Sequence, residues 1–508
     1  MFNFVKKAID EKYAPVNASD REPEIPISCS LKENLSYLKT KFGGSFDLLI
    51  REVKIGGNDG AFVVCDGMCN NLFLSQSVIC PILNSEKICG TPDEQIEIIK
   101  TVVITDIERI QTDNMTKLIS ALTSGFIVVM IDGSSKVATF GVQGYPMRSI
   151  DEPSTEVQER GAREGFVENF KMNASLVRRR LQTPDARIEM IQMGKASSTR
   201  VCICYMNNRV DKKILADVKK RLSEAQFDTV FESGYIQPYL DQKGLSFFSG
   251  VGVTERPDVF CSKLTEGRIG IFVDGTPFAL IVPYLFIENF HSFDDYANRP
   301  YYALFIRLLK LISFFLSVFT PGIYVAVATF SQELLPKTLL FDIISSHAKT
   351  PFPILLEAVI IHIIFEVMRE AGLRLPKSIG HAASIVGGLV IGEAAVSAGL
   401  IAPPMLIVVA LTAITSFVVP NLYEPMAVLR FIFIFVGGIM GLYGIGAVCI
   451  LILFNMCRIN PYGIPFMSPL SPFETAAMRD TVLRLGWKQL SRRKMKIQNL
   501  NGERRDET

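Results

Sequence analysis

The sequence lacks the patterns that mark common catalytic and nucleotide-binding sites. It has four histidines, all after residue 290, and neither a Walker phosphate loop nor a Gly-x-Ser-x-Gly elbow occurs. The glycine-rich segment Gly56–Gly60 reads as a turn, because no helix carrying Lys and Ser or Thr follows it. We therefore expect no catalytic residues, no cofactor and no enzyme activity.

A metal site is not expected either. The ten cysteines are scattered, and the nearest group has the spacings C-x3-C and C-x8-C with no histidine close by: Cys65, Cys69, Cys80 and Cys89. Structural zinc sites use C-x2-C hairpins. Cys202 and Cys204 alternate on a predicted strand, as small core residues do.

A secretory signal is also missing from the start of the sequence. Met1–Lys12 contains early lysines but no apolar core and no small-residue cleavage site. The scattered cysteines agree with a reducing compartment. We therefore expect the region before the first apolar stretch to face the cytoplasm.

Long apolar runs are what the sequence does have, and they begin near residue 300. Ile312–Thr329, Ile401–Val419 and Phe431–Phe454 are each close to the length needed to cross the ~30 Å hydrocarbon core of a bilayer. Before them, charged residues recur every few positions. The sequence predicts a soluble N-terminal region of about 300 residues followed by a polytopic α-helical membrane domain.

The soluble region contains a repeated pattern. Leu118–Gly133 aligns without gaps with Phe260–Gly275, and in each a helix ends near a glycine and a strand runs into an Asp-Gly turn. Internal duplication or convergence explains the match, and either predicts two similar α/β subdomains joined by helices. The expected division is a flexible arm at 1–40, α/β subdomains at 41–150 and 195–290, a helical connector at 151–194, a membrane domain at 300–456 and a basic cytoplasmic tail at 457–508.

The connector carries the run Arg178-Arg179-Arg180 within the helix-rich stretch Glu152–Gln182. Such a run could contact anionic lipid or nucleic acid. The preceding glutamates balance it, so we favour a solvated helix face and expect no nucleic-acid partner.

Charge decides how the five apolar stretches cross: about 303–329, 354–372, 379–400, 401–419 and 427–455. The loop Arg369–Lys377 and the tail after Met456 are rich in Lys and Arg, which places both inside. With the N-terminal region also inside, the number of crossings is even. We predict four crossings and a re-entrant segment at 379–400, whose glycines permit a break.

Ionisable residues within these stretches are costly unless paired or wetted. The second stretch holds Glu357, His362 and Glu366, and the third holds Glu393. At 100° per residue, His362, Glu366 and Arg369 fall within about 60° of each other, with Glu357 on the other side. The stripe is either the lining of an ion path or an ion pair that joins helices. Glu366 and His362 are the first candidates for the path, and Glu357 and Glu393 the second.

Four motifs together carry a resemblance to a known family. They are TERPD (254–258), VDGTPF (273–278), REAGLRLP (369–376) and IVGGLVIGEAAVSAGL (385–400). This combination resembles the A subunit of the GerA family of spore germinant receptors over nearly the whole length. One departure is Ala162, where the family linker usually has proline.

The resemblance implies a role in spore germination. Such A subunits act with a permease-like B subunit and a lipoprotein C subunit in the inner membrane of the spore. They are thought to form a homo-oligomeric ring, proposed to be pentameric, that spans membrane lipid as a nutrient-gated cation channel. One Glu366 per subunit would then form a ring of acids, which favours cations.

Other functions stay open on the sequence alone. A SpoVAF-type paralogue shares these motifs without being a receptor subunit. A nutrient transporter is the second alternative, since the segment 379–404 resembles a broken helix. A scaffold that only anchors a soluble region is the third.

Overall fold

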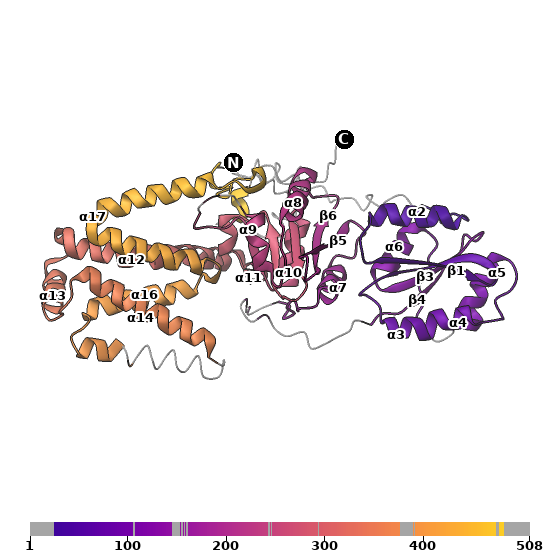
Figure 1. Cartoon of the computed structure of the whole chain (residues 1–508), viewed down its shortest axis with the longest axis horizontal. Helices are drawn as coiled ribbons and strands as arrows, with labels where there is room; N and C mark the ends of the chain where they lie inside the picture. The colour runs from indigo at the N-terminus through magenta and orange to yellow at the C-terminus, as the bar shows by residue number, and fades with distance from the viewer. Residues whose placement is uncertain are drawn as a thin grey trace, which may run out of the picture.

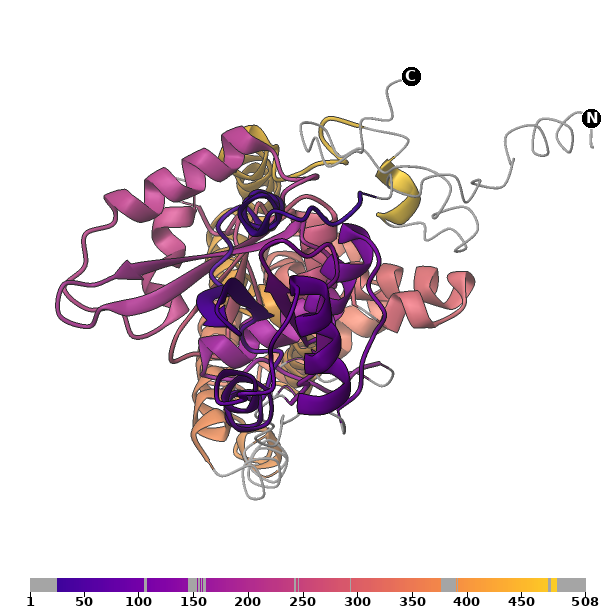
Figure 2. The ribbon, with the colours of Figure 1, turned by 90° about the vertical axis from the view of Figure 1, so that its right-hand side faces the viewer.

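The chain folds into two α/β units and a helical region that follow one another along the long axis (Figure 1). The computed structural model describes residues 25–481 except 105–106, 145–152, 154–155, 157, 159–160, 242–243, 245, 293, 376–389, 391 and 474–476. Figure 2 looks along this axis with the first unit in front. The predicted fold class, an α/β N-terminal region followed by a helical region, is confirmed.

The first unit is a four-stranded antiparallel sheet with the order β1-β2-β3-β4. All six residues of β3 are buried, because the sheet is covered on both faces. Its elements are α2 (Leu31–Phe42), β1 (Leu48–Ile55), β2 (Asn58–Cys65), α3 (Asn71–Phe73), α4 (Cys80–Leu83), α5 (Pro92–Ile98), α6 (Met115–Thr123), β3 (Phe126–Ile131) and β4 (Ala138–Gly141).

The second unit is a five-stranded antiparallel sheet with the order β5-β6-β8-β9-β7. Its elements are α7 (Phe170–Arg180), β5 (Ala186–Met193), β6 (Thr199–Met206), α8 (Lys212–Glu224), α9 (Gln237–Leu240), β7 (Gly252–Thr254), α10 (Pro257–Thr265), β8 (Ile269–Val273) and β9 (Ala279–Val282). The sheet thus begins within the stretch predicted to be a helical connector, where the described helix is α7.

The repeated sequence pattern forms the same structure in both units. In the first, α6 is followed by Gly125, β3 and the turn at Gly133; in the second, α10 is followed by Gly267, β8 and the turn at Gly275. All four glycines have positive φ, between 86° and 100°, which side chains rarely tolerate. The Asp-Gly turns predicted from the sequence are therefore present in both units.

A buried ion pair joins the two units. Arg178 of α7 is 1% exposed and pairs through Nε with Asp47 Oδ2 at 2.7 Å, just before β1. Nearby, Phe46 N donates to Ile188 O at 3.1 Å. The prediction of a solvated Arg178–Arg180 face is wrong for Arg178, because Asp47 compensates its charge in the interior. Arg179 and Arg180 instead pair with Glu164.

The helical region follows through α11 (Asp294–Ala297) and contains α12 (Pro300–Phe330), α13 (Lys337–His347), α14 (Ile354–Arg374), α16 (Pro403–Phe417) and α17 (Tyr423–Arg458). Two segments in the described part of the chain, Pro300–Phe330 and Pro420–Arg458, are long and apolar enough to cross a membrane. Close contact between α12 and α17 depends on glycine, since a Cβ at Gly437 would lie 2.4 Å from Gly322 O.

Helix α17 reverses direction at Gly441, whose φ of 63° and ψ of −155° are not helical. Asn421 lines a cavity with Val253 of the second unit, and Asn455 accepts a hydrogen bond from Ser246 of the same unit. Both ends of α17 therefore lie beside the second unit, and Figure 1 shows two arms. The stretch 427–455, predicted as one span, is a helical hairpin.

Helices α14 and α16 run in the same direction. Glu357, near the start of α14, accepts from Ala402 N at the start of α16. Glu366, towards the end of α14, bonds Tyr423, which follows α16. Leu375 and Ala402 therefore lie towards opposite ends of the bundle. Most of the predicted re-entrant segment, 379–400, lies outside the described residues.

Candidate functional site: a polar network in the bundle and a cavity at its base

Glu366 is the centre of a polar network between the apolar helices. Tyr423 donates its hydroxyl to both carboxylate oxygens, at 2.8 and 2.7 Å. Arg430 Nη1 lies 3.3 Å from Oε1, and Arg369 Nε lies 3.2 Å from Oε2. The fully buried Arg430 also donates to Ser317 O and Oγ. Glu366 therefore joins α14 to α17 and, through Arg430, to α12.

Glu357 belongs to a second network at the opposite end of α14. Its side chain is fully buried, and Oε1 accepts from Ala402 N at 2.6 Å. Oε2 lies 2.8 Å from His347 Nδ1, and His347 Nε2 lies 3.1 Å from the Tyr324 hydroxyl. This row of polar contacts runs through α12, α13, α14 and the beginning of α16.

His362 and Glu393 occupy contrasting positions. His362 is fully buried; Nδ1 bonds Ala358 O at 2.8 Å, and Nε2 has no partner among the described residues. Glu393 lies in a short helical segment, and its side chain is exposed. Glu366 thus pairs with Arg369, as expected if the polar stripe is an ion pair that joins helices. The four predicted residues lie in distinct environments.

The members of these networks that were not singled out from the sequence are Ser317, Tyr324, His347, Tyr423 and Arg430. Arg430 could have been predicted as a paired charge, because it lies beside the long apolar run Phe431–Phe454, where a charge needs a partner. His347 lies between two of the predicted apolar stretches, where nothing in the sequence distinguishes it.

A clamp fixes the base of α12 to the soluble region. The buried Arg307 of α12 pairs with Asp295 of α11 at 2.9 Å and with Asp480 at 3.1 Å. It also donates to the main-chain oxygens of Asp480 and Thr481. The segment after the bundle therefore returns to the junction and bonds the first helix of the bundle.

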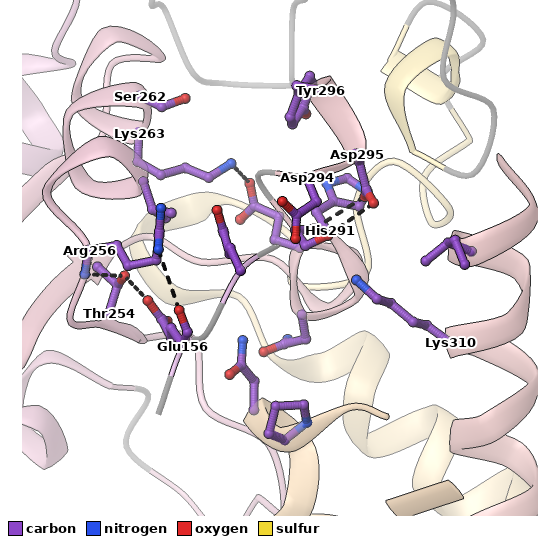
Figure 3. Close-up of a pocket in the computed structure, with 18 of the residues that line it drawn as sticks. Glu156, Thr254, Arg256, Ser262, Lys263, His291, Asp294, Asp295, Tyr296 and Lys310 are labelled. Carbon is purple, nitrogen blue, oxygen red and sulfur yellow. Dashed lines mark hydrogen bonds and ion pairs between the residues drawn. The ribbon is translucent and has the colours of Figure 1, made fainter. Parts of the chain in front are cut away.

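A cavity of about 570 Å³ lies beside this clamp (Figure 3). Its walls come from the second α/β unit, α11, the base of α12 and the turn between α16 and α17. The polar groups that the figure labels are Glu156, Thr254, Arg256, Ser262, Lys263, His291, Asp294, Asp295, Tyr296 and Lys310. The cavity is therefore placed where the soluble and helical regions meet.

Most charges around the cavity are compensated. Burial opposes ionisation of Glu288, but Arg268 at 2.6 Å and Lys263 at 2.8 Å outweigh it and hold its pKa at about 2. Burial, helped by Arg307 and Lys263, lowers the pKa of His291 to about 3. The neutral His291 ring then donates from Nε2 to Thr481 O, 2.8 Å away.

Glu156 is the exception among the carboxyl groups of the cavity. Burial raises its pKa to about 7, against a hydrogen bond from Thr254 Oγ1 at 2.7 Å and the charge of Arg256. It is therefore a carboxyl group that changes charge near neutral pH.

The described residues offer no cluster of three or more His, Cys, Asp or Glu able to hold a metal ion.

Comparison with known proteins identifies the family. The model of the Bacillus/Clostridium GerA spore germination protein matches residues 36–496. The chain belongs to the GerA family. Spore germination protein KA of Bacillus subtilis (strain 168) is 39% identical over 473 residues, covering 92% of this chain and 87% of that protein. Spore germination protein GerLA of Bacillus cereus is 32% identical, covering 88% of this chain and 92% of its own length.

Two further matches are similar to this GerA-family chain. The uncharacterized membrane protein YfkQ of Bacillus subtilis (strain 168) is 36% identical, covering 94% of this chain and 93% of its own length. The other match is the crystal structure of the N-terminal domain of the A subunit of the Bacillus megaterium spore germinant receptor GerK3. The two sequences are 30% identical and the TM-score is 0.41; the alignment covers 52% of this chain and 99% of that domain.

Proposed function

We propose that this chain is the A-type subunit of a germinant receptor in the inner membrane of the spore, and that nutrient bound to the receptor opens a cation path through its helical region. The observation that carries the proposal is the GerA-family match over residues 36–496, which takes in both the soluble and the helical parts. The two apolar helical segments support a membrane location.

The proposed partners are a permease-like B subunit, a lipoprotein C subunit, membrane lipid and further copies of this chain in a ring of five. Large apolar side chains exposed on the helical region support this part of the proposal. Tyr443 is 83% exposed, and Ile407 and Phe454 are each 70% exposed. Such side chains require lipid or protein neighbours.

The proposed orientation places the N-terminal units and the segment after α17 in the cytoplasm. These two parts meet at the Arg307 clamp, so the number of crossings is even. The described helices α12, α14, α16 and the two arms of α17 would supply five. An even total is therefore at least six, rather than the four expected from the sequence.

Within this channel we place Glu393 on the ion path. Glu366 and Glu357 already face cationic or titratable partners, and His362 is enclosed by the bundle. Glu393 is the candidate acid whose side chain is exposed. Repeated around a ring, exposed carboxylates favour cations. Glu366, Glu357 and His362 would then maintain the helix packing that positions the path.

Cation flux from liposomes tests the proposal. The purified chain, with and without its partner subunits and nutrient, is compared with Glu393→Gln and with Glu333→Gln, a control at an exposed loop position. We expect Glu393→Gln to reduce selectivity for cations over chloride, and Glu333→Gln to leave it unchanged. Absence of nutrient-dependent flux from the complete complex would refute the channel.

A second candidate function is a germination membrane protein of the SpoVAF type that is not itself a nutrient receptor. The similarity to YfkQ, a membrane protein without a germination name, favours including it. Deleting the gene separates the two: loss of the response to one nutrient indicates a receptor subunit, whereas a weaker response to all nutrients indicates the paralogue.

A further inference from the structure

We propose that the junction cavity binds a small molecule that carries an anionic group at one end and a hydrogen-bond donor at the other. The anionic group would pair with Lys310, and the donor would bond the wall formed by Glu156 and Gln158. This ligand site is separate from the ion path and does not depend on it.

Lys310 is the cation that would bind the anionic group. Its side chain extends from α12 into the cavity, and its ammonium group has no hydrogen bond or ion pair among the residues that the structure describes (Figure 3). The facing carboxylate of Asp295 is committed to Arg307 at 2.9 Å and to Ser292 Oγ at 3.0 Å. The ammonium therefore keeps its hydrogen-bonding capacity, directed at the cavity.

The other cations of the lining are already satisfied. Arg256 pairs with Asp258 at 2.7 Å and donates to Ala162 O at 2.8 Å. Lys263 pairs with Glu288 at 2.8 Å and with Glu266 at 3.1 Å. An anion that enters the cavity would consequently meet Lys310 as the cation with bonding capacity left.

The wall opposite Lys310 offers acceptors. Gln158 Oε1 is buried and has no hydrogen-bond partner in the described structure. Glu156, two residues earlier, lines the same cavity and accepts a hydrogen bond from Thr254 Oγ1 at 2.7 Å (Figure 3). A buried acceptor without a partner is unfavourable, and a hydroxyl or ammonium donor would remove that cost. One side of the cavity therefore favours an anionic group, and the other favours a hydrogen-bond donor on the same molecule.

The size and position of the cavity suit a small ligand. About 570 Å³ lies within the range of small-molecule pockets, and Ile306, Phe417 and Val418 add an apolar strip for a short carbon body. Because the walls belong to the second α/β unit, α12 and the α16–α17 turn, an occupant would bridge the soluble and helical regions. Both a soluble zwitterion and a phospholipid headgroup with a hydroxyl or amine have this chemistry.

Chemical protection of Lys310 tests the site. The full chain in phosphatidylcholine nanodiscs is acylated with sulfo-N-hydroxysuccinimidyl acetate, and mass spectrometry compares Lys310 with the exposed Lys337. The probes are glycine, the smallest molecule with both groups, and acetate, which lacks the donor. Free glycine also consumes the reagent, so acylation of Lys310 is expressed relative to that of Lys337. At about nine-tenths occupancy, glycine should lower this ratio about tenfold by mass action.

The variant Gln158→Leu tests the donor end without touching the labelled lysine. We expect it to weaken protection by glycine and to leave the effect of acetate unchanged. Equal protection by glycine and acetate in both proteins would overturn the two-ended ligand. Protection of Lys337 to the same degree would also overturn the site, because the effect would then be nonspecific.

Nanodiscs that contain phosphatidylglycerol or phosphatidylethanolamine distinguish the two ligand sources. Protection of Lys310 by these lipids without glycine supports the site with a headgroup as its occupant. No protection by any probe or lipid overturns the proposal and leaves Lys310 as a lysine whose ammonium reaches water. The labelling requires no ion conduction, so its failure is distinguishable from failure of the channel.

Discussion

At the scale of single residues, buried charge in this chain is compensated pair by pair. Five fully buried arginines among the described residues each pair with a carboxylate: Arg178 with Asp47, Arg256 with Asp258, Arg268 with Glu288, Arg307 with Asp295 and Arg430 with Glu366. A buried charge left alone costs far more than the pair contributes. Loss of either member should therefore destabilise the protein more than loss of a surface pair.

The Asp47–Arg178 pair gives the clearest case. Replacing Asp47 with alanine leaves Arg178 unpaired between the two α/β units and should cost about 3–5 kcal/mol. Chemical denaturation of the detergent-solubilised chain measures the change. Asp113→Ala, which removes the exposed pair with Lys117, should cost less than about 1 kcal/mol. Equal effects of the two substitutions would contradict the interpretation.

The carboxyl group of Glu156 predicts a dependence on pH. Because its folded pKa of about 7 lies above the ordinary 4.5, the fold favours the protonated form. That stabilisation is present below pH 4.5 and is lost as the pH rises through about 7. Glu156→Gln should therefore melt at a higher temperature than the unaltered chain at pH 8, with the difference shrinking towards pH 5. A constant difference across this range would refute the raised pKa.

Polar partners that lie close together in the sequence could be predicted, whereas distant ones could not. It identified Glu366 and its neighbour Arg369 because helical spacing brings them together. It missed Arg430 as the third member, since 64 residues separate Arg430 from Glu366 and tertiary packing alone joins them. It misjudged Arg178 for the same reason: the partner Asp47 lies 131 residues earlier.

At the scale of elements, the turn in α17 decides how the last apolar stretch is used. Gly441 combines φ 63° with ψ −155°, a conformation that is essentially restricted to glycine. A Cβ there would also lie 3.3 Å from the Phe330 side chain. The hairpin thus depends on one residue.

Gly441→Ala should destabilise the chain by about 1–3 kcal/mol or more, through backbone strain. Gly446→Ala is the matched control, because nothing lies within 4 Å of a Cβ at that helical position. Thermal unfolding in detergent compares them, and we expect the control to be neutral or slightly stabilising. If both variants unfold alike, the special role of Gly441 is wrong.

The elements of the soluble region were more predictable than those of the bundle. The Asp-Gly turns after β3 and β8 could be anticipated because local geometry requires a residue that accepts positive φ. The reversal at Gly441 could not, since the stretch contains several glycines and hydropathy alone does not distinguish one long helix from two short ones. The beginning of the second sheet at Ala186 was missed because Arg187, Glu189 and Gln192 continue the charged composition of the helix-rich stretch before it.

At the scale of the whole molecule, the soluble and helical regions are joined by polar contacts that depend on distant segments. Asp480, beyond the bundle, bonds Arg307 at the base of α12 and accepts from the Tyr296 hydroxyl at 2.8 Å. The same junction contains the cavity. A change in either region can therefore reach the other through this point.

Asp480→Ala should release the segment around residue 480 while Asp295 continues to neutralise Arg307. Hydrogen–deuterium exchange of the full chain should speed up in residues 477–481, with α12 protected as before. Asp342→Ala, at an exposed position of α13, is the control and should leave that segment unchanged. Unaltered exchange in Asp480→Ala would show that the clamp does not hold the segment.

A cysteine at residue 393 tests most directly whether the chain contributes an acid-lined cation path. Nutrient-dependent flux through Glu393→Cys receptors is measured before and after a water-soluble, positively charged methanethiosulfonate reagent, with the unaltered chain as the control for its ten native cysteines. The account predicts that the reagent blocks flux in the variant and spares the control. Flux through the variant that persists unchanged, with residue 393 shown to be labelled, would contradict it.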